Sequence, residues 1–100
     1  MLFLPSYGIP LATTQSLSVG ATATGLTVPV GATAAIVSVE TEAVRYRDDG
    51  TAPTATVGVY LPVTATIGSL YSFIGRAILA NIQFIATTGT ATVTVAYYKV

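Results

Sequence analysis

The groups that could do chemistry are concentrated in one short segment of the chain. Six of the eight charged residues fall within positions 40–49: Glu40, Glu42, Arg45, Arg47, Asp48 and Asp49. Two neighbouring carboxylates can act as general acid and base when an apolar pocket raises the pKa of one of them. Here two arginines lie among the acids, and a nearby guanidinium favours the ionised carboxylate. The segment therefore argues against acid–base catalysis, and we expect no enzyme.

The same acids could instead hold a cation. Asp48 and Asp49, with Glu40 or Glu42, would supply oxygen ligands of the kind that calcium prefers. The segment lacks the alternating D-x-D-x-D spacing that calcium loops favour. We expect neither a metal site nor a bound cofactor.

A structural role fits these residue types better. Asp48-Asp49-Gly50 is typical of a turn, because an Asp side chain bonds to the backbone ahead of it and Gly tolerates a positive φ. The two glutamates precede the two arginines on neighbouring stretches, which predicts ion pairs between strands or across a subunit boundary. We therefore assign the six charged residues to folding or assembly.

Tyrosines offer a second kind of candidate site. Tyr60, Tyr71, Tyr97 and Tyr98 could form an aromatic platform that binds a sugar. The chain has no Trp, and strand alternation would place Tyr97 and Tyr98 on opposite faces of a sheet. Packing of the rings with solvated hydroxyls is the favoured interpretation, and a carbohydrate-binding sandwich stays open as an alternative.

The composition excludes several classes of function. The 100 residues include no Cys and no His, so the chain has no disulfide, no thiolate metal site and no histidine base. A net charge of zero with four scattered cations argues against nucleic acid. The mean hydropathy of +0.72 invites a membrane interpretation. Residues 86–94, however, read ATTGTATVT, which is strand and turn material, so we expect no membrane segment.

These residues must be positioned by strands, because the apolar pattern has a period of two. Alternation over Ile78–Ala86 and over Ala91–Tyr97, joined by Thr87-Thr88-Gly89-Thr90, predicts a β-hairpin. Asn81 and Gln83 would then face water or a partner.

The middle of the chain repeats this pattern with a change of phase. The alternation of Ala34–Glu40 slips by one position before Val44–Arg47, which predicts a bulge or a tight turn at Thr41–Ala43. Further short strands are expected at 15–19, 25–28 and 56–61, with a turn at 28–32. Residues 69–76 fit either a helical turn or an irregular strand.

Seven or eight short strands at this spacing predict an all-β domain. The expected fold is a single antiparallel β-sandwich or small barrel, jelly-roll-like, over residues 13–100. Residues 1–12 would form an arm that is ordered only in an assembly. The chain is so apolar, with 52% hydrophobic and 8% charged residues, that an interface with other subunits should take up part of its surface.

One stretch resembles a known group of proteins. Residues 44–55, VRYRDDGTAPTA, are similar to a stretch of small virion structural proteins, about 100 residues long, encoded among the structural genes of tailed bacteriophages and prophages. The similarity extends over residues 27–98, through the strand ending at Glu40, the segment Gly58–Val63, the Asn81–Ala86 stretch and the final strand.

This resemblance implies a component of a phage particle. The favoured interpretation is a head decoration or cement protein, made in the host cytoplasm and seated on the capsid surface. Its partners would be copies of itself, with a trimer expected, and the major capsid protein or another virion protein. A tail, baseplate or fibre module is the alternative.

Overall fold

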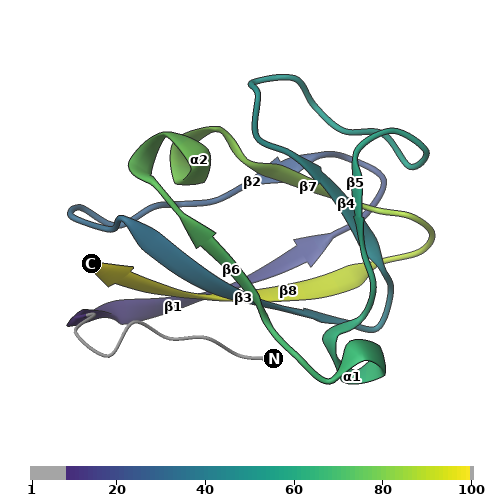
Figure 1. The fold of residues 1–100 in the computed structure, drawn as a ribbon. Helices are drawn as coiled ribbons and strands as arrows, with labels where there is room; N and C mark the ends of the chain where they lie inside the picture. The colour runs from purple at the N-terminus through teal and green to yellow at the C-terminus, as the bar shows by residue number, and fades with distance from the viewer. Residues whose placement is uncertain (1–8, 100) are drawn as a thin grey trace.

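The computed structural model describes residues 9–99, which form two four-stranded antiparallel sheets packed face to face (Figure 1). One sheet, here the β8 sheet, has the strand order β1-β8-β3-β6; the other, the β7 sheet, has the order β2-β7-β4-β5. The elements are β1 (Ile9–Val19), β2 (Thr24–Gly25), β3 (Ala34–Glu40), β4 (Val44–Arg47), β5 (Val59–Leu61), α1 (Thr64–Ile67), β6 (Tyr71–Ile74), α2 (Arg76–Asn81), β7 (Gln83–Ala86) and β8 (Ala91–Lys99). The predicted all-β sandwich is confirmed, with eight strands among residues 9–99.

The order of the strands defines the fold more closely. Successive strands lie in different sheets at every link except the one from β4 to β5. Eight strands arranged in this way form a jelly roll, a double sheet built from two Greek keys. The first and last described strands pair side by side, with Ile9 opposite Lys99 and Val19 opposite Ala91.

The core lies between the sheets and follows the predicted alternation best in β8. Ala91, Val93, Val95 and Tyr97 are all buried, while the residues between them are only half-buried. Val37 and Val39 of β3 complete the same inner face. Strict alternation in β8 explains why this strand could be interpreted from its sequence.

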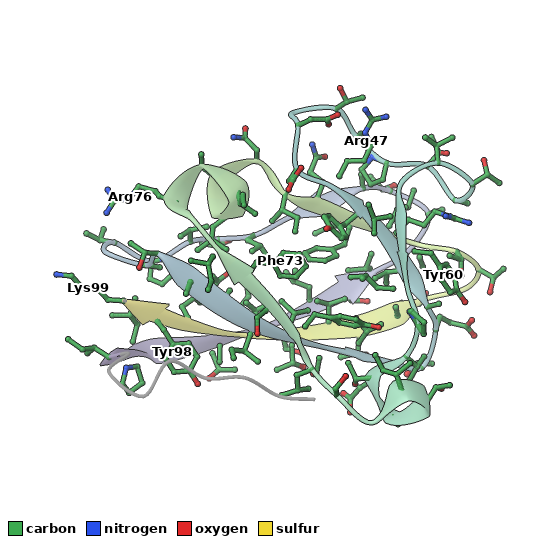
Figure 2. All side chains as sticks on the ribbon, viewed as in Figure 1. Arg47, Tyr60, Phe73, Arg76, Tyr98 and Lys99 are labelled. Atoms are coloured by element: carbon green, nitrogen blue, oxygen red, sulfur yellow. The ribbon has the colours of Figure 1, made fainter. Side chains whose placement is uncertain are left out.

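Three aromatic rings join the two sheets. Phe73 of β6 contacts Tyr46 of β4 edge-to-face, with ring centroids 5.1 Å apart, and lies 6.3 Å from Phe84 of β7. Figure 2 shows Phe73 between the sheets. Edge-to-face pairs add to the stability that burial alone provides.

The predicted hairpin of the last two strands is wrong. β7 belongs to one sheet and β8 to the other, so residues 87–90 carry the chain across the sandwich. This link is fastened to other loops: the amide of Ala86 donates to Gly20 O at 3.0 Å, and the amide of Thr87 to Ala43 O at 3.0 Å. A four-residue Gly-containing link can serve either connection, so the local sequence did not decide between them.

The strand predicted to begin at Ile78 is also shorter than expected. Residues 76–81 form α2, and β7 begins at Gln83. Gly75, at φ 128°, turns the chain after β6, and its carbonyl accepts from the amide of Leu79 at 3.1 Å. Leu79 and Ile82 are buried, and their positions suit a helical face as well as a strand. Asn81 is exposed and donates to Ala77 O, whereas Gln83 is half-buried.

The change of phase in the middle of the chain is a tight turn, as predicted. β3 has the expected bounds, and the chain then passes to the other sheet at β4. Glu42 N donates to Glu40 O at 3.0 Å around Thr41, whose φ is 79°. A positive φ at a β-branched residue is rare and strained.

The remaining predictions vary in accuracy. Residues 71–74 form a strand, β5 spans three of the six expected residues, and β2 covers Thr24–Gly25 rather than 25–28. The turn before β3 is present, closed by the amide of Ala32 on Pro29 O. Of the expected arm, residues 1–8 lie outside the described residues, while residues 9–12 already belong to β1. Neither α1 nor α2 has the length or apolarity to span a bilayer, and residues 9–99 contain no other helix.

Candidate functional site

The charged segment is divided among three places in the fold. Glu40 ends β3 and is exposed, and Glu42 lies in the turn to β4. Arg45 and Arg47 project from the outer face of β4, since Val44 and Tyr46 take the inner positions. Asp48 and Asp49 begin the loop of residues 48–58 that connects β4 to β5, here called the β4–β5 loop. A segment that is compact in sequence is therefore spread over two sheets.

The predicted pairing of glutamates with arginines within the chain is wrong. β3 and β4 lie in different sheets, so the two acids and the two bases do not face each other across a ladder. Among the described residues, the salt bridge present is Arg47 with Asp49. Glu42 instead accepts a hydrogen bond from Thr88 Oγ1 at 3.0 Å, which ties the β3–β4 turn to the β7–β8 link. Pairing of Glu40 across a subunit boundary stays a prediction.

Arg45 fastens the β4–β5 loop to the sheet. Its Nε donates to Ala55 O at 3.1 Å and one terminal nitrogen donates to Gly58 O at 3.0 Å. Its guanidinium also lies over the ring of Tyr60, 5.3 Å from the centroid. Arginine suits this role because its planar group carries several fixed donors and stacks on aromatic faces.

Gly58 allows the backbone at the end of the loop to lie close against β4. Its φ is 136°, and a Cβ at this position would lie 3.0 Å from Tyr46 O and 3.2 Å from Arg45 Cβ. The backbone can therefore approach β4 only without a side chain. The end of the loop is therefore restricted to a backbone shape that only glycine at position 58 allows.

The start of the loop is held by Arg47 and Asp49. The guanidinium bonds both carboxylate oxygens, at 3.3 and 2.5 Å, and Asp49 Oδ1 also accepts from the amide of Thr51 at 3.1 Å. The hydrogen bond from Arg47, then that from Thr51, lowers the pKa of Asp49. Gly50 follows at φ 84°. The predicted Asx turn is confirmed, and both side chains act on the loop's own geometry.

The two aspartates of the β4–β5 loop are both exposed. Over residues 9–99, no three acidic side chains gather in a group that could hold a metal ion. Pro53 is buried within the loop. A cleft of about 410 Å³ lies beside it, lined by Ala21, Ala23 and the residues of positions 52–55 and 85–89.

The four tyrosines do not form one platform. Tyr97 is 1% exposed, and its hydroxyl donates to Gln15 Oε1 at 2.6 Å. Tyr71 donates to Pro62 O at 2.6 Å, across the β5–β6 link. Tyr60 is exposed on β5, and Tyr98 lies on the outer face of the β8 sheet (Figure 2). Tyr97 and Tyr98 occupy opposite faces, as predicted.

Two features escaped the sequence analysis. Gln15 of β1 accepts hydrogen bonds from both the Tyr97 hydroxyl and the Thr27 amide. No local sequence pattern predicts these two contacts. Large apolar side chains are also exposed at Val57 in the β4–β5 loop, at Val59 and Tyr60 of β5, and at Ile67 of α1. The available signal was the absence of any charged residue from 50 to 75.

Comparisons with known proteins add no relative. No family model, no curated protein and no solved structure matches this chain.

Proposed function

We propose that this protein is a structural component of a tailed-phage virion, a decoration or cement protein on the capsid shell. It acts as a homo-oligomer, with a trimer expected, and stabilises the head by bridging adjacent capsid subunits. The observation that carries this proposal is the way in which residues 44–55, the stretch on which the resemblance rests, are held in place by side-chain hydrogen bonds. The charged side chains of this stretch hold a loop in place through Arg45, Arg47 and Asp49. These side chains therefore serve the structure of the loop.

The fold supports the proposal without deciding it. Jelly rolls form viral capsid domains and also lectins, so the architecture allows both a virion part and a sugar-binding module. The dispersed positions of the tyrosines favour the virion part. Tyr97 is in the core and Tyr98 is on the far side of the β8 sheet from it.

The surface is suited to contact with other subunits. Its accessible area, 5278 Å², is close to the roughly 5300 Å² that a monomer of this mass exposes. The chain thus completes its own core, and the apolar residues left outside are available to partners. The larger of these are Ile9, Val30, Val57, Val59, Tyr60, Ile67 and Ile74.

Bridging would work through repetition. A closed oligomer presents the same weak contact several times, and simultaneous contacts raise the overall affinity well beyond that of one. Each bridge adds buried area between capsid subunits that the packaged genome pushes apart. The major capsid protein is the proposed partner.

The test is to locate the chain in particles. Heads and tails of a phage that encodes it are separated, and the protein is quantified in each fraction by mass spectrometry. We expect many copies in the head fraction. Heads lacking the protein should release DNA at a lower temperature, and added purified protein should restore the original value. Confinement to the tail fraction would favour the tail, baseplate or fibre module, and absence from both fractions would refute the proposal.

A further inference from the structure

The start of the β4–β5 loop contains the pair Asp49-Gly50, a sequence at which a peptide chain can rearrange spontaneously. The Gly50 amide nitrogen can attack the side-chain carboxyl carbon of Asp49, because glycine has no Cβ to hinder the approach. The chain has one such pair: its other aspartate, Asp48, precedes Asp49, and its one asparagine, Asn81, precedes Ile82. A reaction of this kind therefore has a single candidate position.

The reaction has two steps, which release and then take up one molecule of water. In the first, a bond forms between the Gly50 nitrogen and Cγ of Asp49, and the carboxyl C–O bond breaks. The hydroxyl leaves with the amide proton as water, and a five-membered succinimide remains. In the second, water opens the ring. Opening at the main-chain carbonyl of Asp49 leaves Gly50 joined through the side chain, as isoaspartate, whereas opening at Cγ restores aspartate.

The Asx turn holds the two reacting groups close together. Asp49 Oδ1 accepts from the amide of Thr51 at 3.1 Å, so the carboxyl group is folded over the intervening peptide of Gly50. Gly50 is exposed, at φ 84°. Apart from its chain neighbours, no described residue would lie within 4 Å of a Cβ placed there. The site is therefore open, and proximity of this kind favours an intramolecular reaction.

Arg47 opposes the reaction because it keeps the carboxyl group ionised. In Figure 2, Arg47 lies at the start of the loop. Its Nε and one terminal nitrogen donate to Oδ1 and Oδ2 of Asp49 at 3.3 and 2.5 Å, a two-pronged contact that favours the carboxylate. These hydrogen bonds, then that from Thr51, lower the pKa of Asp49. Arg47 is the ion-pair partner that the described residues give to Asp49, and Asp48 is the adjacent acid.

The ionised form of the carboxyl group does not cyclise. A carboxylate would have to expel an oxide ion, whereas the protonated acid expels water. We propose that Asp49-Gly50 is the site at which this protein is spontaneously modified to isoaspartate, and that Arg47 sets the rate by withholding the reactive protonated acid. The inference goes beyond the proposed function and does not rest on it.

The modification would release the loop at its start. The main chain gains one carbon atom, and the free carboxylate moves to the former main-chain carbonyl, away from the Arg47 guanidinium and the Thr51 amide. Arg45 still holds Ala55 O and Gly58 O. We therefore expect the modified loop to be fastened at its end alone.

The first experiment incubates the folded wild type and Arg47→Ala in warm solution at one neutral pH, and circular dichroism verifies both folds. Peptide mapping separates the isoaspartyl peptide from the unmodified peptide of equal mass, and an isoaspartate-specific methyltransferase identifies it. We expect slow accumulation at Asp49 in the wild type and faster accumulation in Arg47→Ala. The rate should rise about tenfold for each unit by which the variant raises the Asp49 pKa, measured by NMR titration.

Arg45→Ala is the matched control, because it loosens the other end of the loop without removing a partner of Asp49. Its Asp49 pKa and its rate of isoaspartate formation should stay close to those of the wild type. Arg47→Lys keeps the charge but loses the two-pronged contact, so its rate should lie between those of the wild type and Arg47→Ala. In denaturant, the wild type and Arg47→Ala should react equally fast, because the contact belongs to the folded chain.

Two sets of results would overturn the inference. Equal rates for folded wild type and Arg47→Ala, or an equal acceleration in Arg45→Ala, would remove the role of Arg47. Isoaspartate at Asp48 in place of Asp49, or none in Arg47→Ala, would remove the assignment of the site.

Discussion

The two sheets of this sandwich are held together in different ways. In the β8 sheet, three strands are long, with 11 residues in β1, 7 in β3 and 9 in β8. In the β7 sheet the strands have 2, 4, 4 and 3 residues. Long backbone ladders join the three long strands, with one irregularity between Pro10 and Thr14 of β1, whereas the short strands have fewer ladder pairs and are also tied by side chains that bond to loop carbonyls and amides. Backbone pairing is more extensive in the β8 sheet, and side-chain contacts have a larger share in the β7 sheet.

This difference has a consequence for function. Ladder bonds need no particular side chains, so the outer face of the β8 sheet carries small polar and apolar residues such as Ser16, Thr94 and Ala96. In the β7 sheet, Arg45, Asp49 and Gly58 are each required by a specific contact. Residues 44–55 comprise β4 and most of the β4–β5 loop, where these specific contacts are made.

The largest expected effect comes from removing Phe84, one of the three rings that join the two sheets. Phe84→Ala should lower the free energy of unfolding by about 3–5 kcal/mol, because it leaves a cavity beside Tyr46 and Phe73. Chemical denaturation measures the change, with the fully exposed Val30→Ala as the control. A loss below about 1 kcal/mol would show that the rings do not join the sheets as described.

The second effect tests the dependence of the β7 sheet on side chains. Arg45→Ala should cost about 1–3 kcal/mol, since two carbonyls lose a charged donor and Tyr60 loses its cation. Cleavage by protease within residues 48–58 should become faster while the β8 sheet keeps its protection from hydrogen exchange. Arg76→Ala, an exposed arginine on α2, serves as the control. Equal loss of protection in both sheets would contradict the distinction between them.

A third prediction concerns alkaline pH and the β8 sheet. Burial raises the pKa of Tyr97 from about 10 to about 12. A raised folded-state pKa means that the unfolded chain releases its proton first, so stability is fully present below pH 10 and falls as pH rises towards 12. In Tyr97→Phe this part of the decline should vanish, whereas Tyr98→Phe should keep it. Denaturation curves at several alkaline pH values would show whether the decline is the same in all three proteins.

The smallest effect concerns the exposed pair at the start of the loop. Arg47→Ala should lower stability less than Arg45→Ala, and added salt should shrink the difference from wild type. The pKa of Asp49 is lowered, so its contribution is present above the unfolded-state pKa and is lost as pH falls through the folded value. In Arg47→Ala the Asp49 pKa should rise towards its ordinary value, measured by NMR titration. An unmoved Asp49 pKa would mean that Thr51 alone sets it.

The sequence predicted the β8 sheet better than the β7 sheet for the same physical reason. In β8 the apolar alternation matches the alternation of burial, and in β3 most residues are buried, so that both strands have a clear apolar signal. The turn at Thr41 and the Asx turn at Asp49 also had local signals, a change of phase and a D-D-G sequence. These features depend on neighbours in the chain.

The errors arose where distant residues decide. Whether residues 87–90 close a hairpin or cross the sandwich depends on Gly20 and Ala43, which supply the carbonyls that the link needs. The helix at 76–81 depends on the turn at Gly75 and on the space that Leu79 fills at the end of the core. The expected ion pairs of Arg45 and Arg47 with Glu40 and Glu42 do not form within the chain, because β3 and β4 lie in different sheets.

The pairing of β1 with β8 also affects how the chain folds while it is being synthesised. The hydrogen bond from Tyr97 to Gln15 closes a separation of 82 positions, and β8 lies between β1 and β3 in its sheet. On a ribosome, β1 emerges first and must wait unpaired until β8 has been synthesised, whereas β3 can pair with β6 earlier but keeps its other edge open until β8 arrives. A topology dominated by such distant contacts folds in milliseconds to seconds rather than microseconds. The nascent chain therefore passes through a period in which open strand edges are exposed.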